Sequence, residues 1–112
     1  MGGGLFIWSG KVTLRSCTIS GNKAENSGSG LFLYTGEVTF TSCTISDNNG
    51  ARNDVQNKGG GLYIYSGKVT LTRCTISGNR AERSFGGGLY ISSGDVTLTS
   101  CTISDNKAVL SF

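Results

Sequence analysis

The sequence predicts an all-β fold in which one short unit recurs four times and winds into a solenoid. Four cysteines, at positions 17, 43, 74 and 101, each lie twelve residues after a Gly-Leu pair. Self-similarity at intervals of 26 to 31 residues is typical of units that bury a core only by stacking on one another. No window has the apolar spacing of an amphipathic helix, and the 18 glycines in 112 residues would weaken any helix that they interrupted.

Each unit contains about three short runs with the two-residue alternation of β-strands. In the first unit these runs are residues 5–8, 11–15 and 17–20, with corners at Gly10 and at Gly21-Asn22. Because each run recurs in the same order, a coil in which every strand pairs in parallel with its own copy fits better than an antiparallel meander. We therefore expect a parallel β-helix of about four coils with three short strands each. The single domain, 1–112, would comprise coils 2–27, 28–58, 59–85 and 86–112.

Alternation along the strands also predicts which side chains point inward. Six apolar columns are expected inside the coil, represented in the first unit by Leu5, Ile7, Val12, Leu14, Cys17 and Ile19. The residues between them are expected outside, namely Phe6, Trp8, Thr13, Arg15, Thr18 and Ser20 with their equivalents in later units. Like residues would then stack on like residues from coil to coil.

Two polar columns are expected to hold the coils in register. Asparagine recurs at 22, 48, 79 and 106, where an Asn at a bend tolerates left-handed backbone and its amide can bond the identical amide one coil away. Lys11, Glu37, Lys68 and Asp95 form another column, in which the sign of the charge alternates up the stack. We interpret both columns as structural, since an amide ligand site lacks further support and exposed ion pairs contribute only about 0 to 1 kcal/mol each.

The cysteines are interpreted as a column of small buried side chains. Free cysteine is among the most buried residue types, the chain has no histidine and no Cys-x-x-Cys pair, and this spacing matches no zinc site. We therefore expect no metal and no cofactor. Stacked cysteines would also lie within disulfide reach, so two bridges between coils stay open for an oxidising compartment.

The repeats resemble those of right-handed parallel β-helix proteins. Each unit begins with a Gly-rich and apolar run and continues to Thr-Ile-Ser-Gly/Asp-Asn; the runs are Gly-Gly-Gly-Leu-Phe-Ile at 2–7, Gly-Ser-Gly-Leu-Phe-Leu at 28–33, and Gly-Gly-Gly-Leu-Tyr-Ile at 59–64 and 86–91. They are most similar to repeats of polymorphic outer membrane proteins and autotransporter passengers, which carry a Gly-Gly-small/apolar-apolar motif and a Phe-x-x-Asn motif. Residues 19–22 match the second motif with Ile in place of Phe. The resemblance covers essentially the whole chain and implies an extracellular or cell-surface location.

An enzyme is not expected. β-Helix enzymes that act on polysaccharides, which the repeats also resemble, use clustered aspartates on one outer face, whereas this chain has seven acidic residues and no histidine. Asp47 and Asp105 share a column position but would lie two coils apart, at about 10 Å, so acid-base chemistry lacks its usual groups. The long connection 49–58 mixes charges without a recognisable site and is interpreted as a tolerated insertion.

The outward aromatic residues are the predicted contact surface. They form two columns two residues apart on one strand, which predicts an exposed strip suited to a protein or a glycan; its members are Phe6, Trp8, Phe32, Tyr34, Tyr63, Tyr65 and Tyr90. Covering by another segment, or ladder stacking alone, is the alternative explanation. A second outer face repeats Thr-x-Thr at 39–41, 70–72 and 97–99, which resembles the ice-binding faces of β-solenoids. We expect a structural or adhesive module, with ice binding or a fragment of a carbohydrate-active enzyme as alternatives.

Composition limits the partners. A net charge of +3 from 10 basic and 7 acidic residues is mild, and the basic residues are scattered, so nucleic acid is not an expected partner. No apolar run reaches membrane-spanning length, and residues 1–4 do not resemble a signal peptide. Neither end carries a polar capping sequence, so we expect either a piece of a longer solenoid with flanking coils or end-to-end self-association.

Overall fold

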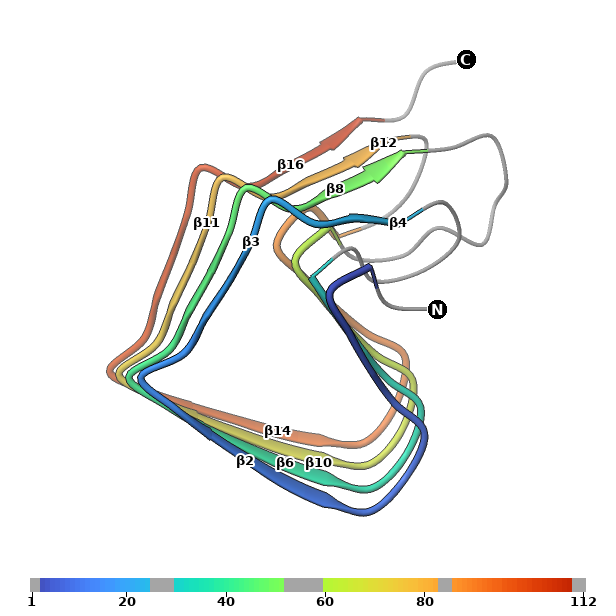
Figure 1. Cartoon of the computed structure of the whole chain (residues 1–112), viewed down its shortest axis with the longest axis vertical. Helices are drawn as coiled ribbons and strands as arrows, with labels where there is room; N and C mark the ends of the chain where they lie inside the picture. The colour runs from blue at the N-terminus through green and yellow to red at the C-terminus, as the bar shows by residue number, and fades with distance from the viewer. Residues whose placement is uncertain (1–2, 25–29, 52–59, 83–85, 110–112) are drawn as a thin grey trace.

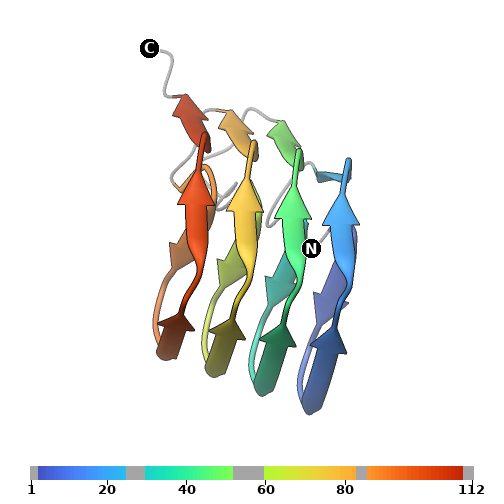
Figure 2. The ribbon, with the colours of Figure 1, turned by 90° about the vertical axis from the view of Figure 1, so that its left-hand side faces the viewer.

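The chain folds as a parallel β-helix in the computed structural model, which describes residues 3–24, 30–51, 60–82 and 86–109. Viewed end-on, the coils enclose a single core between flat walls that meet at sharp corners (Figure 1). Viewed from the side, the coils lie side by side in chain order (Figure 2). In the described ranges each wall is a sheet of four strands, so four coils stack and about three full turns separate the first from the last.

Each coil contributes one strand to each of four sheets, and every pairing is parallel. The first sheet comprises β1 (Leu5–Ile7), β5 (Leu31–Leu33), β9 (Leu62–Ile64) and β13 (Leu89–Ile91). The second comprises β2 (Lys11–Arg15), β6 (Glu37–Thr41), β10 (Lys68–Thr72) and β14 (Asp95–Thr99). The third comprises β3 (Thr18–Ser20), β7 (Thr44–Ser46), β11 (Thr75–Ser77) and β15 (Thr102–Ser104). The fourth comprises β4 (Lys23–Ala24), β8 (Asn49–Ala51), β12 (Arg80–Glu82) and β16 (Lys107–Val109).

The fourth sheet corrects the expectation of three strands per coil. Its strands contain only two or three residues, and in each the position that faces the core is a small residue such as Ala24 or Ala81, both buried. A run this short has no apolar alternation to mark it in the sequence. Backbone pairing with the coils on either side makes it a strand, as in the register of Ala81 with Gly50 and Ala108.

The predicted register and the inward columns are confirmed. Equivalent residues pair from coil to coil, as Val38 does with Val12 and Val69. The core includes fully buried side chains from the first three sheets, among them Leu31, Phe40 and Ile76, each 0% exposed. Because identical columns stack directly, the apolar side chains of one coil pack on those of the next, and burial of this kind is the main stabilising term.

An asparagine ladder runs up one corner, as predicted. Asn22 Nδ2 donates to Asn48 Oδ1 at 3.0 Å, Asn48 Nδ2 to Asn79 Oδ1 at 2.9 Å, and Asn79 Nδ2 to Asn106 Oδ1 at 2.9 Å. Each of the last three amides also donates to a carbonyl of the preceding coil, as Asn79 does to Ile45 at 2.9 Å. Asn48 and Asn79 are fully buried, so these bonds satisfy polar groups that water does not reach.

The repeated Gly before Leu is explained by the same ladder. A Cβ at Gly61 would lie 2.8 Å from Asn79 Nδ2, and one at Gly30 would lie equally close to Asn48 Nδ2. A Cβ at either glycine would lie closer still to the carbonyl oxygen of the equivalent glycine in the next coil. The glycine column is therefore required by the backbone of the next coil as well as by the buried amide.

The left-handed backbone at this corner lies one residue earlier than expected. Positive φ occurs not at the asparagines but at Gly21, Asp47, Gly78 and Asp105, with values from 55° to 66°. The asparagine side chain is occupied by the ladder, so the exposed residue before it makes the tight bend. Two further corners have positive φ in every coil: Gly10, Gly36, Gly67 and Gly94 at 104° to 110°, and Ser16, Ser42, Arg73 and Ser100 at 51° to 54°.

All four cysteines are thiols, and their inward position is confirmed. Cys43 and Cys74 are buried at 1% exposure, whereas Cys17 and Cys101, in the outer coils, are half-buried. The Cys43 thiol donates to the carbonyl of Leu14 at 3.3 Å. Burial raises the pKa of the Cys74 thiol, so this side chain behaves as a small apolar group rather than as a nucleophile.

Candidate functional site

Among the described residues, the two most exposed aromatic side chains, Trp8 and Tyr65, lie just beyond the first sheet. Trp8, Tyr34 and Tyr65 follow β1, β5 and β9 directly and form what we call the outer ladder. The rings of Trp8 and Tyr34 stack with centroids 4.3 Å apart and planes 9° apart, and those of Tyr34 and Tyr65 are 5.0 Å and 2° apart. Trp8 is 62% exposed and Tyr65 44%, so the ladder presents ring edges and hydroxyl groups to solvent.

A second stack, the inner ladder, runs along the first sheet itself. It comprises Phe6, Phe32, Tyr63 and Tyr90, whose successive ring centroids lie 5.2, 4.8 and 5.3 Å apart. The expectation that these residues form an exposed column is wrong in the middle coils, because Phe32 is only 9% exposed and Tyr63 only 5%. Each of these two rings lies between neighbouring rings on both sides, whereas Phe6, at the start of the stack, remains 36% exposed.

Burial of the inner ladder has an electrostatic consequence at Tyr63. Loss of hydration, with smaller contributions from the neighbouring Tyr90 and Tyr65, raises the pKa of the Tyr63 phenol. Its hydroxyl therefore stays protonated to higher pH than a phenol in water. Of the seven residues predicted as a contact strip, Trp8 and Tyr65 are the most exposed, Phe6 is exposed at the edge, and Tyr34 and Tyr90 are half-buried.

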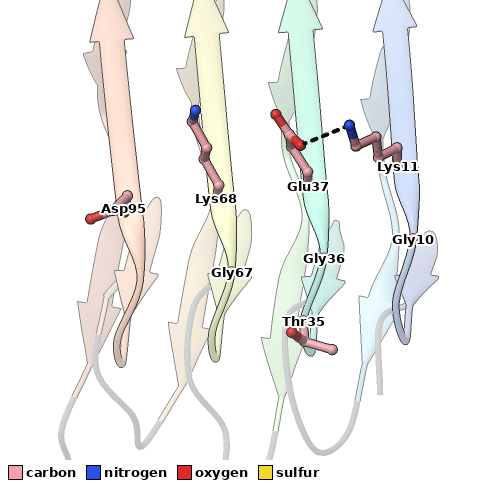
Figure 3. Close-up of a pocket in the computed structure, with 8 residues that line it drawn as sticks. All are labelled: Gly10, Lys11, Thr35, Gly36, Glu37, Gly67, Lys68 and Asp95. Carbon is pink, nitrogen blue, oxygen red and sulfur yellow. Dashed lines mark ion pairs between the residues drawn. The ribbon is translucent and has the colours of Figure 1, made fainter.

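An open groove of about 580 Å³ follows the corner between the first and second sheets. It begins two residues after the outer ladder, at the column Gly10, Gly36 and Gly67, and the alternating charge column forms its other wall. Lys11 Nζ lies 3.6 Å from the Glu37 carboxylate (Figure 3). Among the described residues, Lys68 and Asp95 form no ion pair, so their charges are available at the surface.

The groove was not anticipated from the sequence. The charge column was recognised, but only as a device for coil order, and the glycine column only as a turn. The available signal was the spacing of an aromatic residue, a glycine and a charged residue in the first three coils, as in Trp8, Gly10 and Lys11. The glycine at the corner contributes no side chain, and the groove opens there beside Thr35.

The threonine face lies on the second sheet and points outward as predicted. Thr39, Thr70 and Thr97 are in register, and a second column aligns Thr41, Thr72 and Thr99. The first coil has Arg15 in the second column. The complete Thr-x-Thr array therefore covers only three strands, a width of about 10 Å.

The carboxylates of Asp47 and Asp105 do not form a cluster. Asp47 and Asp105 occupy corners in coils separated by the one that contains Gly78. In the part of the chain that the structure describes, no three His, Cys, Asp or Glu side chains are placed to hold a metal ion. Residues 52–59 of the long connection lie outside the described ranges. Within those ranges, no helix is long and apolar enough to cross a membrane.

Comparison with known proteins identifies the family. A family model described as a right-handed β-helix region matches residues 3–111, nearly the full length. Neither the curated proteins nor the solved structures gave a match. The chain therefore belongs to the right-handed β-helix family, in agreement with the repeat, the parallel sheets and the stacked columns.

Proposed function

We propose, from the premise that the chain is a right-handed β-helix repeat region, that it is a non-enzymatic structural or adhesive module that contacts a protein partner through the outer ladder. The observation that carries the proposal is the exposure of Trp8 and Tyr65 in a stacked and regular array. Large apolar side chains are seldom left in contiguous exposed patches on soluble proteins unless they contact a partner. Tryptophan and tyrosine are also the residues most enriched at binding hot spots.

The ring geometry favours a protein over a glycan. A sugar ring packs on the face of an aromatic side chain, but in the outer ladder Tyr34 has Trp8 on one face and Tyr65 on the other, within 5.0 Å. Among the described residues no stacked ring covers the second face of Trp8 or of Tyr65, so these two end faces and the row of ring edges between them remain open. The positive edges of aromatic rings and the phenol groups suit carbonyl oxygens and apolar side chains, and these groups are abundant on a protein surface.

The groove beside the ladder supports the same assignment. Protein interfaces combine an apolar centre with a polar rim, and here the ladder adjoins a column in which Lys11, Glu37, Lys68 and Asp95 alternate in sign. A partner whose charges alternate in the complementary order would be aligned along the stack. A shift of the partner by one coil would place like charges opposite each other, and their repulsion would disfavour that position. The outer ladder would then supply most of the affinity and the charge column the register.

The wider context forms part of the proposal. The similarity of the repeats to autotransporter passengers suggests an extracellular or cell-surface setting. A non-enzymatic role is supported by the separation of Asp47 and Asp105 and by the lack of histidine. Ice binding through the threonine face has less support, because the array is narrow and threonine is a preferred outward residue in any strand.

Replacement of Trp8, Tyr34 and Tyr65 by Ser tests the proposal. The wild type and the variant are offered to purified extracellular-matrix proteins and to a glycan array, and their affinities for the matrix proteins are measured by surface plasmon resonance. We expect the wild type to bind at least one matrix protein, and the triple variant to lose at least about tenfold in affinity, as the removal of hot-spot residues does.

The matched control is Thr39→Ser with Thr70→Ser, in the coils of Tyr34 and Tyr65 but on the neighbouring sheet, which should bind as the wild type does. Circular dichroism must report β-structure for both variants. Equal binding by the triple variant would refute the assignment of the outer ladder. Binding to glycans alone would refute the choice of a protein partner.

A further inference from the structure

In the first and last coils, one side of the apolar core has no described coil packed against it. In the last coil Ile91 and Leu98 are each 42% exposed and Ile103 is 48% exposed, although all three belong to inward columns. Their equivalents one coil earlier are 0% exposed. The strands of the first and last coils form opposite edges of the stack (Figure 2), and each edge leaves one side of its backbone unpaired within the described residues.

We propose that these two surfaces are complementary and that a second copy of this chain stacks head to tail on the first, with β1 to β4 of one copy continuing β13 to β16 of the other. Three columns support this register, and each is independent of the outer ladder. In the proposed contact Lys11, Gly21 and Asn22 of one copy lie over Asp95, Asp105 and Asn106 of the other.

The charge column is the first argument. Its order through the chain is Lys11, Glu37, Lys68 and Asp95, and each is aligned with the next by strand register. The sign therefore alternates with a period of two coils, and a stack that continues beyond Asp95 requires a cation. Lys11 of a second copy supplies it, in the same relation that places Lys11 3.6 Å from Glu37 within one chain.

The second argument is a steric column with the same period. At the corner before each Asn the residues are Gly21, Asp47, Gly78 and Asp105. A Cβ on Gly78 would overlap the end of the Asp47 carboxylate in the preceding coil, so a side chain there would require that carboxylate to turn aside, whereas glycine leaves it in place. Gly21 would likewise leave the Asp105 carboxylate in place. Among the residues that the structure describes, nothing lies within 4 Å of the position that a Cβ at Gly21 would take.

The asparagine ladder is the third argument. Its amide-to-amide hydrogen bonds all run in one direction along the stack, and among the described residues the ladder has no partner beyond either end. In the interior each coil donates two hydrogen bonds to the next Asn Oδ1, as the backbone N–H and Nδ2 of Asn48 do to Asn79 at 3.0 and 2.9 Å. Among the described residues, no coil follows that of Asn106 and none precedes that of Asn22. In the proposed contact Asn106 donates twice to Asn22 Oδ1, and Asn22 Nδ2 donates to the carbonyl of Ile103, as Asn48 Nδ2 does to Ile19 at 3.0 Å.

The head surface is shaped to receive such a contact. An open hollow of about 290 Å³ lies in the first coil, lined by Gly4, Leu5, Thr18, Ile19, Ser20 and Asn22. In the fourth sheet the contact brings Lys107 of one copy beside Lys23 of the next. Arg80 and Lys107 are likewise in register within the chain.

Blocking one end at a time tests the proposal. Gly21→Asn adds a Cβ at the head while accepting the local φ of 66°, which asparagine tolerates. Asn106→Ala removes the ladder donor at the tail, and Thr13→Asn, on an outward face of the first coil, is the control. The mass of each protein is measured by sedimentation equilibrium from low micromolar to near-millimolar concentration, with circular dichroism to report the fold.

We expect the wild type and Thr13→Asn to grow beyond dimers as concentration rises, with an axial repeat of about 19 Å per copy in micrographs. Each end variant alone should associate at least about tenfold more weakly. An equimolar mixture of the two end variants should form dimers and no larger species, because Gly21→Asn keeps its tail and Asn106→Ala keeps its head.

A wild type that stays monomeric throughout, or end variants that assemble as well as the wild type, would overturn the proposal. Larger species in the mixture would also contradict a head-to-tail contact. The variant with Ser in place of Trp8, Tyr34 and Tyr65 should still assemble, so this inference and the proposed function can fail separately.

Discussion

The two middle coils and the two end coils of this protein have nearly the same sequence but very different environments. Leu71 and Leu98 occupy the same column of the second sheet, yet Leu71 is 0% exposed and Leu98 42%. Ile76 and Ile103 differ in the same way, at 0% and 48%. A residue in a middle coil has a described coil on both sides, whereas a residue in an end coil has one on one side only. A residue's contribution to the free energy of unfolding therefore depends on its coil as much as on its type.

The largest expected effect of this difference concerns the glycine corner. Gly67 and Gly10 share a positive φ, at 110° and 104°. A Cβ at Gly67 would collide with the carbonyl oxygen of Gly36, whereas no atom of another described residue beyond the chain neighbours lies within 4 Å of a Cβ at Gly10. Gly10→Ala should cost about 1 to 3 kcal/mol of the free energy of unfolding through backbone strain alone. Gly67→Ala should cost roughly 3 to 5 kcal/mol, because the collision adds to the strain.

Urea unfolding at a concentration where the chain is monomeric measures both variants. Equal losses for Gly67→Ala and Gly10→Ala would show that the preceding coil does not approach as closely as the structure has it. A negligible loss for Gly10→Ala would instead mean that the corner relaxes to an ordinary φ when no coil precedes it.

Truncation of the leucine column should give the next largest contrast. Leu71→Ala removes a fully buried side chain between two coils and should cost about 3 kcal/mol, within the range of buried Leu-to-Ala changes. Leu98→Ala should cost about 1 kcal/mol or less, since much of that side chain is already in water. The free energy of unfolding from urea titrations followed by circular dichroism checks the pair, and a Leu98→Ala loss as large as that of Leu71→Ala would contradict the comparison.

The smallest effect is a dependence on alkaline pH that distinguishes the two ladders. Burial raises the pKa of Tyr63 in the folded state, so the neutral phenol contributes stability that is complete below the unfolded pKa of about 10. This contribution is lost as pH rises through the higher folded value. We therefore expect the midpoint of urea unfolding to fall less steeply above about pH 10 in Tyr63→Phe than in the wild type.

The converse variant sharpens this measurement. Phe32 is buried beside Tyr63 in the inner ladder, and Phe32→Tyr would add a second buried phenol to the same stack. Its midpoint should fall more steeply with pH than that of the wild type. Identical slopes for all three proteins would mean that the inner ladder is hydrated and that its low exposure has no electrostatic consequence.

Much of this architecture was accessible from the repeat alone. Once the cysteines, asparagines and Gly-Leu pairs had been aligned, the parallel pairing and the register followed, because stacked copies of one unit place each residue over its own equivalent. The inward position of Cys43 and the amide contacts of Asn48 and Asn79 were predicted in this way and are confirmed. The short fourth strand was missed, because it contains too few residues to show a period.

The sequence by itself therefore determined the order of the columns, their inward or outward direction and the partner of each residue in the next coil, since these depend only on the repeat and on the two-residue period of a strand. Only the tertiary structure decided that Phe32 and Tyr63 are covered while Trp8 and Tyr65 remain exposed, and that a groove opens beside the charge column. The exposure of a side chain depends on how closely strands, corners and neighbouring rings pack around it in three dimensions. The repeat pattern is the same in every coil, so it does not contain this information.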